Sequence, residues 1–571
     1  MRTGKMVAEW RGRLERTTRV RAVRAKVRSV SAPNSTGMND DADPGEAPAL
    51  ETGQHRKLAR STLIFSVATG VSRVLGLVRE MVAAYYFGIN GLINAFVVAF
   101  QIPNLVRALL ADAALSGAFV PVFSDLLDKG ERKRAWRVAS TIFWLVLLVL
   151  GGLTALFILI APILMRPFGD PGGDFDLAVG LSRVLFPIVV LLGLSGVIVG
   201  ILNTYDHFTV PALTPVFWNL AIIAGLWLGV PRVSGEDAQL YVYAGAILVG
   251  TLIQLFLPVP WLRGLDGRLQ LVLDWRDPAV RRFFRLMLPV TLTLGLVNVN
   301  AVIDTLFASR LLDPDLAPAA INAAFRLYML PQGMFAVAVA TVLFPALARL
   351  AARNDLDGFR ATVSTGLRQI AFLLIPASVV SAVLAEPIVR VVYARGAFTE
   401  SDVAVVAGCL AAFSLGLVFN GWMLMLTRGF YGLQSNWIPT GVAIGTLGLN
   451  AVLDSVLYRV GIWGIPFATS IVNVIGAGLL VFFLRRRVGG IGLARVTGAI
   501  VRVTLASVVL GAVAFGVWHT LDRALGRSVV AQIVSLGVAL ALGGAVYLGS
   551  CRLLRLHEFD VLRDTVLRRA G

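Results

Sequence analysis

The chain has 571 residues, of which 57% are hydrophobic and only 15% are charged. This balance excludes an ordinary soluble protein, because apolar stretches of about 20 residues, the length that crosses a bilayer, recur from Ser61 almost to the C-terminus. The net charge of +18 lies mostly in short loops between apolar segments. That distribution is typical of membrane-topology signals and not of a nucleic-acid-binding domain.

The residues that usually carry catalysis or bind metals are sparse. The two cysteines, Cys409 and Cys551, lie far apart and form no disulfide framework. The four histidines show no metal-ligand spacing, and no Walker A lysine loop, Ser-His-Asp arrangement or paired carboxylates stand out. We therefore expect neither an enzyme nor a metal or cofactor site.

Residues 1–60 differ from the rest of the chain. A basic run from Arg11 to Arg28 precedes an acidic, proline-containing stretch at 38–51, and no apolar core of a signal peptide is present. The composition predicts a disordered cytoplasmic tail, which serves either as a tether to a membrane or partner or as an extension without function. Translation from Met38 would leave the whole membrane region intact.

The remaining sequence predicts an all-α polytopic membrane protein with about 14 transmembrane helices. The expected spans are 62–86, 91–124, 138–166, 177–202, 210–230, 240–262, 284–308, 316–348, 366–394, 402–427, 438–458, 463–484, 496–519 and 528–551.

The loops between these spans alternate in charge. The loops that follow the second, sixth, eighth and twelfth spans are rich in Lys and Arg, whereas loops after odd-numbered spans carry one or two basic residues at most. The positive-inside rule then places both termini in the cytoplasm.

An internal similarity suggests two halves. INAFVVAFQIP at 93–103 and INAAFRLYMLP at 321–331 share Ile, Asn, Ala and Pro at the same spacing, and both begin even-numbered spans. We expect spans 1–6 and 7–12 to form two pseudo-symmetric six-helix lobes, with a site at their interface and a C-terminal helix pair outside the repeat. The alternative is chance similarity between two apolar segments.

Four arginines lie inside these apolar segments: Arg73, Arg79, Arg107 and Arg326. A charged side chain near the bilayer centre costs at least a few kcal/mol, so such residues normally face a protein interior or a water-filled cavity. Arg107 is nearer a helix end, where its side chain can instead reach the headgroups. Because Glu80 can neutralise only one neighbouring arginine, the excess of cations predicts a cavity for an anion.

Guanidinium presents a planar fork of donors that suits phosphate oxygens and stays charged when desolvated. A diphosphate headgroup fits this requirement better than a cationic drug or a neutral sugar. The polar residues Asn298, Asn300 and Asp304 of the seventh span either line the same cavity or form hydrogen bonds between helices.

Several segments resemble a known family. SRVLGLVRE at 72–80, AFVVAFQIPNLVRALLADAALSGAFVPVF at 95–123, ILNTYDHFTVPALTP at 201–215 and FRLYMLPQGMFAVAVATVLFPALA at 325–348, followed by RGAFT and GFYGLQ, closely resemble the lipid II flippase family MurJ, also called MviN. The resemblance implies the fold of the multidrug/oligosaccharidyl-lipid/polysaccharide exporter superfamily. It also implies transport of lipid II, an undecaprenyl-diphosphate-linked disaccharide-pentapeptide, from the inner to the outer leaflet by alternating access.

The resemblance also implies a set of site residues. The family's cavity arginines fall on Arg73, Arg79, Arg107 and Arg326, its nearby small polar positions on Ser72 and Asn104, and two acidic positions on Glu80 and Asp112. Two further acidic positions of the family are occupied here by Asn94 and Met329, which puts the family's energy coupling in doubt for this chain and leaves the membrane potential or the substrate gradient as sources.

Three functions remain open from the sequence. They are lipid II transport, transport of another polyprenyl-diphosphate oligosaccharide or a drug, and a non-transporting scaffold that contacts cell-wall synthesis proteins. The four arginines disfavour an exporter of cationic drugs, because they would repel its substrate. They also disfavour a scaffold, because nothing in that function offsets the free-energy cost of burying four charges in the membrane. The predicted organisation is a tail at 1–60, an N-lobe at 61–262, a C-lobe at 263–487, a helix pair at 488–553 that holds the lipid tail, and a basic cytoplasmic tail at 554–571.

Overall fold

The computed structural model describes residues 47–110, 113–556 and 558–559, and every regular element within them is helical. The α-helices are α2 (Ala47–Phe87), α3 (Ile93–Leu110), α4 (Ala113–Asp128), α5 (Arg132–Met165), α6 (Phe175–Leu185), α7 (Pro187–Thr204), α8 (Thr209–Gly229), α9 (Glu236–Phe256), α10 (Pro278–Leu311), α11 (Ala317–Pro331), α12 (Val337–Ala352), α13 (Leu356–Val383), α14 (Ala385–Tyr393), α15 (Glu400–Ser414), α16 (Leu417–Gly432), α17 (Trp437–Leu457), α18 (Gly464–Val488), α19 (Leu493–Leu525) and α20 (Val529–Leu553). A π-helix, η5 (Gln332–Ala336), joins α11 to α12, and short 3-10 helices lie between other elements.

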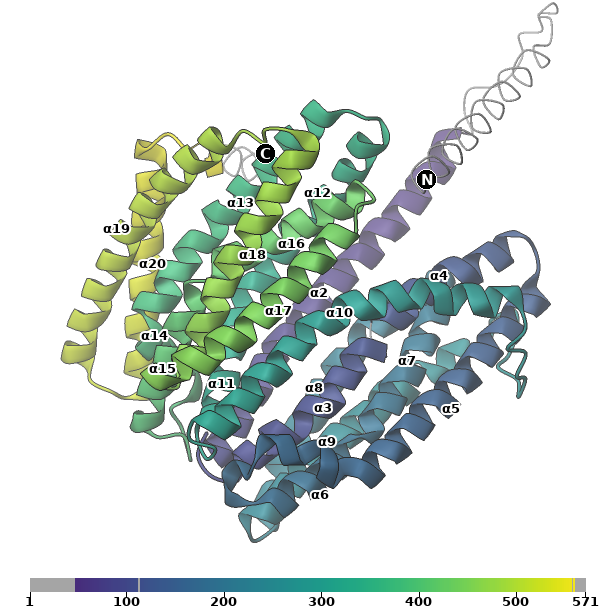
Figure 1. Ribbon diagram of the computed structural model, residues 1–571, viewed down its shortest axis with the longest axis horizontal. Coiled ribbons are helices and arrows are strands. Elements are labelled where there is room, and N and C mark those ends of the chain that lie inside the picture. Colours follow the sequence, from purple (N-terminus) through teal and green to yellow (C-terminus); the bar gives the residue numbers. More distant parts are fainter. Residues whose placement is uncertain (1–46, 111–112, 557, 560–571) are drawn as a thin grey trace, which may run out of the picture. The chain divides into compact units, whose positions relative to one another are not determined.

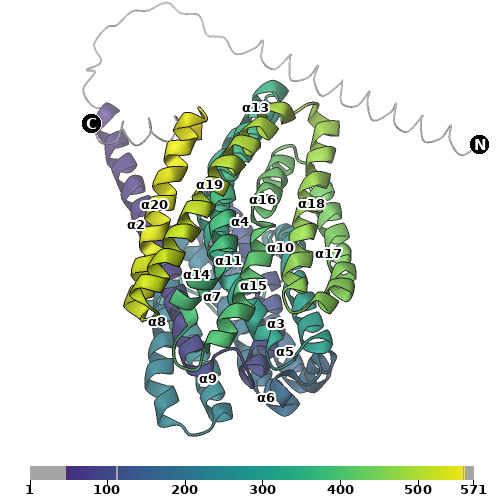
Figure 2. The same ribbon diagram turned by 90° about the vertical axis from the view of Figure 1, so that its left-hand side faces the viewer.

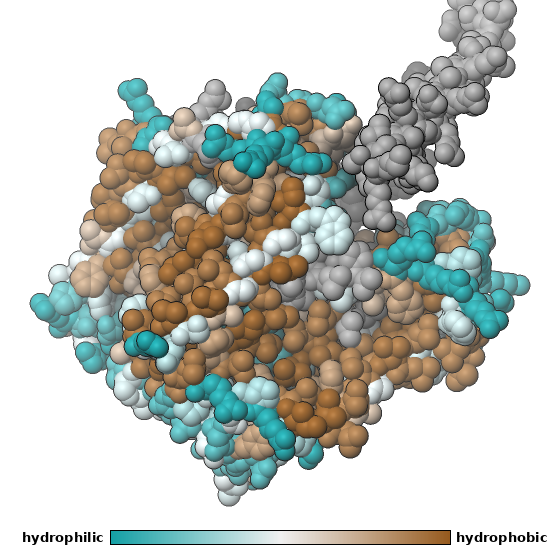
Figure 3. Space-filling view, viewed as in Figure 1, coloured by the Kyte–Doolittle hydropathy of each residue, from teal (hydrophilic) through white to brown (hydrophobic). Residues whose placement is uncertain are grey.

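The chain is a multi-pass membrane protein. Ten helical spans among the described residues are long and apolar enough to cross a bilayer, and an eleventh results if α15 and α16, bent by 43°, are one span. Large apolar side chains such as Leu159 and Val342, which are about three-quarters exposed (76% and 75%), lie on these helices. The face drawn in Figure 3 is mostly hydrophobic, with hydrophilic residues gathered toward its ends.

The expected count of 14 is therefore not reached on length and hydropathy alone. The expected spans 62–86, 91–124 and 284–308 are missing from those that pass this test, and 402–427 passes only as the bent pair α15 and α16. Helix α2 places Arg73, Arg79 and Glu80 within its apolar stretch. The expected span at 91–124 contains α3 and α4, and residues 111–112 between them lie outside the described residues. The expected span at 366–394 is divided, because α13 ends at Val383 and α14 follows.

The tail prediction needs one correction. Residues 47–60, which we expected to be disordered, belong to helix α2, because this stretch contains good helix formers such as Ala, Leu, Gln, Lys and Arg. The rest of that tail, and residues 560–571 of the C-terminal one, lie outside the described residues.

Within residues 61–571 the helices gather in two groups (Figure 1). Helices α3–α9 form the N-terminal group, in which α8 packs on α9 and α5 on α7. Helices α11–α18 form the C-terminal group, in which α13 and α18 pack on α16. Helix α10 contacts α3 and α4 of the first group and α17 of the second. It is therefore packed against both.

Helices α19 and α20 pack along each other, and α19 contacts α13 while α20 contacts α14 (Figure 2). The Tyr547 hydroxyl of α20 donates a hydrogen bond to the Phe372 carbonyl of α13 at 2.7 Å. This pair thus lies on the C-terminal group and adds no helix to the N-terminal one.

Candidate functional site

Charged side chains meet where α2 approaches α11. Arg79 and Glu80 of α2 form an ion pair, and Arg326 Nε of α11 lies 3.6 Å from the same carboxylate, at Glu80 Oε1. The Arg79 and Glu80 side chains are 11% and 18% exposed, whereas the Arg326 side chain is 37% exposed, so the contact is shielded on the α2 side and open to solvent on the α11 side. One carboxylate is therefore shared by guanidinium groups from two distant parts of the chain.

The donors of this contact are incompletely satisfied. The Nε atoms of Arg79 and Arg326 are buried and have no hydrogen-bond acceptor in the structure. The Arg79 guanidinium lies over the ring of Trp218 on α8, 4.7 Å from the ring centroid. This cation–π contact stabilises the positive charge but does not supply an acceptor for the Nε hydrogen. Unpaired buried donors are rare in proteins, and a ligand with acceptor oxygens would account for them.

Arg73 reaches the C-terminal group at a different point. A Cβ atom added to Gly333, in the π-helix η5, would lie 2.4 Å from a terminal guanidinium nitrogen of Arg73. The absence of a side chain at Gly333 is what admits the guanidinium here. π-helical turns are frequently found at functional sites, and this one places a glycine against a cation from α2.

We call Arg73, Arg79, Glu80 and Arg326 the arginine–glutamate group. The group holds three positive charges and one negative charge, so its formal net charge is about +2 at neutral pH, although only Arg79 and Arg326 pair with Glu80. Arg73, Arg79 and Glu80 come from α2, whereas Arg326 comes from α11. The group therefore exists only while α2 and the C-terminal group lie close together.

The other predicted site residues have different surroundings. The Arg107 guanidinium donates two hydrogen bonds to Asn104 Oδ1, at 3.2 and 2.8 Å, one turn earlier on α3. The Ser72 carbonyl accepts a long hydrogen bond of 3.4 Å from Asn219 of α8. Asp112 lies outside the described residues.

Asn94 is completely buried and bonds only to backbone in the contacts described for it. Its amide nitrogen donates to the carbonyls of Ile89, Gly91 and Asp315 at 2.9, 3.1 and 2.6 Å, and its oxygen accepts from the Ala319 N–H at 2.8 Å. A carboxylate at this position could accept from Ala319 but could not donate to the three carbonyls. Here Asn94 joins α3 to the start of α11 and does not face the arginine–glutamate group.

Asn94 is part of a wider contact between the two groups of helices, which we call the closed end. It consists of residues 85–94, 313–319 and 396–402. Asn90 donates to Asp402 at 2.7 Å, and the Ala397 N–H donates to the Tyr85 carbonyl at 2.8 Å. Gly396 has φ +64°, and a Cβ atom there would lie 2.1 Å from the Tyr85 carbonyl oxygen. Only glycine fits this turn.

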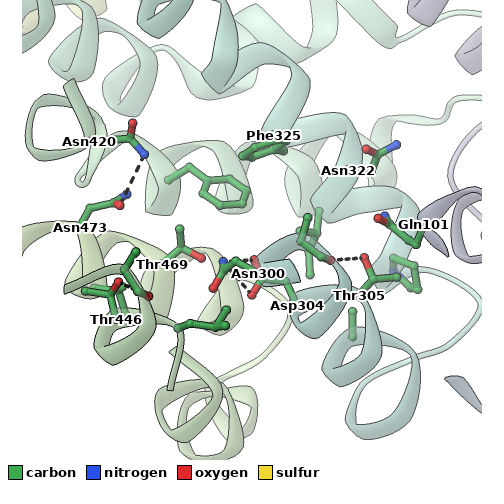
Figure 4. A pocket seen from close by; sticks show the side chains of 18 of the residues that line it. Gln101, Asn300, Asp304, Thr305, Asn322, Phe325, Asn420, Thr446, Thr469 and Asn473 are labelled. Atoms are coloured by element: carbon green, nitrogen blue, oxygen red, sulfur yellow. Dashed lines mark hydrogen bonds between the residues drawn. The ribbon is translucent and has the colours of Figure 1, made fainter. Parts of the chain in front are cut away.

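A second polar cluster lies in a cavity of about 230 Å³ lined by α3, α10, α11, α15, α16, α17 and α18 (Figure 4). Its polar lining consists mainly of amides and hydroxyls, namely Gln101, Asn300, Thr305, Asn322, Asn420, Thr446, Thr469 and Asn473, together with one carboxylate, Asp304. None of the four arginines lines it. Of the two alternatives left open for these residues, the bond between helices is present at Asp304, which accepts from Asn450 of α17.

A second carboxylate adjoins this cavity. The amide nitrogen of Asn450 on α17 donates to Asp304 Oδ1 at 2.6 Å and to Asp454 Oδ2 at 2.8 Å, and all three residues are buried. Two carboxylates held together in an apolar interior do not both stay charged without a compensating positive charge. We call Asp304, Asn450 and Asp454 the acid–amide cluster, and a proton or a small cation fits its chemistry.

Sequence reasoning missed Asn450 and Asp454. They are four residues apart in an otherwise apolar helix, which puts both on one face, and an acid inside a membrane span is itself a sign of function. That signal was present in the sequence. Trp218 and Gly333, by contrast, are ordinary residues of apolar segments until the fold places them beside arginines.

The family model described as lipid II flippase MurJ matches residues 83–535. The chain belongs to this family. A probable lipid II flippase MurJ of Vibrio cholerae is 31% identical over 532 residues, which cover 90% of this chain and 100% of the relative. A lipid II flippase MurJ of Burkholderia cenocepacia is 32% identical over 447 residues, which cover 75% of this chain and 84% of that protein.

Solved structures agree with the family. A structure described as lipid II flippase MurJ in an inward closed conformation is similar with a TM-score of 0.69 and 25% identity, over 85% of this chain and 98% of that one. An inward-facing multidrug transporter of the MATE family is similar with a TM-score of 0.60 and 17% identity, over 75% of this chain and 94% of that one. At that identity, the second match speaks for the fold alone.

Proposed function

We propose that this protein is a flippase that carries lipid II from the inner to the outer leaflet of a bacterial cytoplasmic membrane. Membership of the MurJ family and the many membrane-spanning helices support this function. The substrate consists of a polyprenyl tail, a diphosphate and a disaccharide-pentapeptide. The protein therefore needs a polar path for the headgroup and a lipid-facing surface for the tail.

The observation that carries the proposal is the arginine–glutamate group. A diphosphate diester carries about two negative charges, which matches the formal surplus of this group. Its oxygens would accept from the Arg79 and Arg326 Nε atoms, which have no acceptor now. Charge-assisted hydrogen bonds of guanidinium to phosphate are strong and directional, so the diphosphate is the part of lipid II that this group fits.

Glu80 has a defined role in this mechanism. In the absence of substrate it is the shared partner of Arg79 and Arg326. An arriving diphosphate would replace Glu80 as the hydrogen-bond acceptor. When the diphosphate leaves, Glu80 would form its ion pairs with Arg79 and Arg326 again. Because the group combines α2 with α11, its occupancy would depend on how the two groups of helices lie, which is the requirement of alternating access.

We also propose the finer architecture of fourteen crossings. Helix α2, α3 together with α4, α10, and α15 together with α16 would each cross the membrane once, in addition to the ten spans that pass on hydropathy. Charged side chains in α2 are acceptable if they face the protein. Residues 61–262 and 263–487 would be the two lobes, and both termini would lie in the cytoplasm, in accord with the basic loops.

Helices α19 and α20, within residues 488–553, would guide the polyprenyl tail. Exposed apolar residues on both helices, among them Val508 and Val530, support such a surface. The acid–amide cluster would supply the energy coupling, by exchanging a proton or a small cation as its surroundings change. Carboxylate, amide and hydroxyl oxygens are suitable ligands for hard cations.

The test is complementation of a bacterium depleted of its own MurJ, with the wild type beside Arg73→Ala and Arg326→Ala at matched membrane abundance. Rescue by the wild type and loss in both variants would support lipid II transport through the arginine–glutamate group. Failure of well-expressed wild type would favour another polyprenyl-diphosphate oligosaccharide or a scaffold of cell-wall synthesis. Rescue by all three would contradict the arginine mechanism.

A further inference from the structure

The segment between α9 and α10 is ordered but not helical from Arg263 to Asp277, and we call it the α9–α10 loop. It is held against α5 by bonds to side chains. Trp144 Nε1 donates to the Gln270 carbonyl at 2.8 Å, and the N–H groups of Gln270 and Asp274 donate to Ser140 and Thr141 at 3.0 and 3.1 Å. At the right-hand edge of Figure 1 the loop runs beside α5.

The order of these contacts shows that the loop descends along α5 and returns. Its end at Asp277 bonds to Arg134, in the first turn of α5, whereas its middle bonds to Trp144. Gln270 bonds to Ser140 and Trp144, six to ten helical residues beyond Arg134, which corresponds to about 9–15 Å along the helix axis. Because α5 is the helix of a membrane span, the turn at Gln270–Val272 lies deeper toward the bilayer than either end of the loop.

The deepest part of the loop carries large apolar side chains directed away from the protein. Leu271 is 81% exposed, Trp275 58% and Leu273 48%. On the other side, Leu265 and Leu269 pack against the core of the N-terminal group. Exposed leucines beside a tryptophan are unfavourable in water but suit the boundary between headgroups and acyl chains.

The acidic and basic side chains of the loop also lie on different sides of it. Two of its acids pair with arginines at the start of α5: Asp277, whose side chain is 10% exposed, with Arg134 at 3.1 Å, and Asp266, which lies at the surface, with Arg132 at 2.8 Å. Its arginines, Arg263, Arg268 and Arg276, are exposed. The surface that the loop presents is therefore apolar at its tip and basic along its flanks.

We propose that the α9–α10 loop inserts Leu271, Leu273 and Trp275 into the leaflet of its own side and binds anionic phospholipid headgroups through Arg268 and Arg276. That this is the cytoplasmic leaflet rests on the orientation given under the proposed function. The lipid surface is favoured over a protein partner because the apolar tip lies at membrane depth along α5. Each exposed arginine near an anionic surface contributes to such binding.

The test measures the depth of the loop directly. A fluorophore is placed on Leu271→Cys in a background with Cys409→Ala and Cys551→Ala, and the full-length protein is reconstituted in vesicles that contain doxyl-labelled lipids. Val149, 59% exposed in the middle of α5, provides a deep reference, and Asp357, whose side chain is 92% exposed at the start of α13, an aqueous one. We expect the Leu271 label to be quenched by shallow doxyl lipids at least twofold more than the Asp357 label, and less than the Val149 label by deep ones.

The binding of anionic headgroups by Arg268 and Arg276 is tested by changing the lipid composition of the vesicles. Raising the phosphatidylglycerol content of phosphatidylcholine vesicles should increase quenching at Leu271, and Arg268→Gln with Arg276→Gln should remove at least half of that increase. Arg349→Gln with Arg353→Gln, two exposed arginines near the end of α12, is the matched control. A Leu271 label that behaves like the Asp357 label would overturn the proposal and leave a protein partner for this face. Both results are independent of whether the protein flips lipid II.

Discussion

The arginine–glutamate group and the acid–amide cluster both place charged side chains among apolar helices, but they draw them from different parts of the chain. The first combines α2 with α11, and its Arg73 contacts η5. The second uses α10 and α17, which pack on each other. A site shared between groups of helices changes when they move, whereas a site within packed helices keeps its ligands together. We infer that the contacts of the arginine–glutamate group would change with the conformation of the protein, whereas the acid–amide cluster would keep a bound proton or cation during the change.

The largest effect is expected from removing Arg326. Arg326→Ala leaves Glu80 with one guanidinium and the diphosphate with one fewer partner, and a hydrogen bond to a charged group contributes about 1.5–3 kcal/mol. We expect lipid II transport in vesicles to fall by about 100-fold. Arg459→Ala, which removes an exposed arginine that lies over Tyr458, should leave transport unchanged. Equal losses in both variants would indicate damage to the fold.

The next effect concerns the closed end, where the two groups of helices meet. Asn94→Asp keeps the shape but puts a carboxylate against three carbonyl oxygens, so we expect it to destabilise this conformation by about 1–3 kcal/mol. Thermal unfolding in detergent and the reactivity of a cysteine at Asn90 would measure this. Asn436→Asp, at the start of α17, is a control away from the closed end. Unchanged reactivity at position 90 would contradict the role given to Asn94.

The acid–amide cluster should respond differently. Asp304→Asn or Asp454→Asn removes one charge while keeping the hydrogen-bonding shape, so the protein should fold and still bind lipid II. We expect transport to fall by about tenfold and to lose its dependence on the pH or cation gradient, since a single carboxylate no longer requires a compensating charge. Transport that keeps its gradient dependence in both variants would place coupling elsewhere.

Glu80→Gln tests whether the carboxylate of the arginine–glutamate group competes with the substrate. Removing the competing carboxylate should tighten binding of a diphosphate lipid by about tenfold, equal to about 1.4 kcal/mol, and slow its release. Binding would rise while turnover falls, a combination that general damage would not produce. Asp357→Gln, at an exposed carboxylate paired with Arg360, serves as the control. Weaker binding by the Glu80 variant would show that Glu80 orients the arginines instead of competing with substrate.

The smallest effect is expected at the ion pair that anchors the α9–α10 loop. Burial opposes the ionisation of Asp277, but hydrogen bonds from Arg134 and the Ala279 N–H outweigh it and lower the pKa of this carboxyl. Its contribution to stability is therefore complete above the ordinary carboxyl pKa of about 3.9 and is lost as the pH falls through the lower folded-state value. Asp277→Asn should cost about 0.2–1 kcal/mol at pH 7, measured by thermal unfolding, and less near pH 3.

Part of the site could be read from the sequence, because a charge in an apolar segment is visible without a structure. Arg79, Glu80 and Arg326 were identified in this way and lie together. The acid–amide cluster was only half visible, since Asp304 was noted but its link to Asn450 depends on the packing of α10 against α17. Trp218 and Gly333 could not be identified from the sequence, because they matter only through the fold, which places them beside the guanidinium groups of Arg79 and Arg73.

The repeat shows where sequence similarity stops being informative. Asn94 and Asn322 occupy equivalent places in the two similar segments. Asn94 is fully buried among backbone groups of the closed end, whereas Asn322 lines the polar cavity. The same residue in the same local sequence has two roles, because different helices pack against the two copies.

The sequence by itself determined that this chain crosses the membrane many times, that arginines lie inside it and that its family is that of MurJ, because hydropathy, charge and motif spacing are local properties. Only the tertiary structure decided that Arg79 and Arg326 share one carboxylate, that two buried acids share one amide, and that the α9–α10 loop turns its leucines outward. Each of these depends on contacts between residues more than a hundred positions apart, which local preferences do not encode.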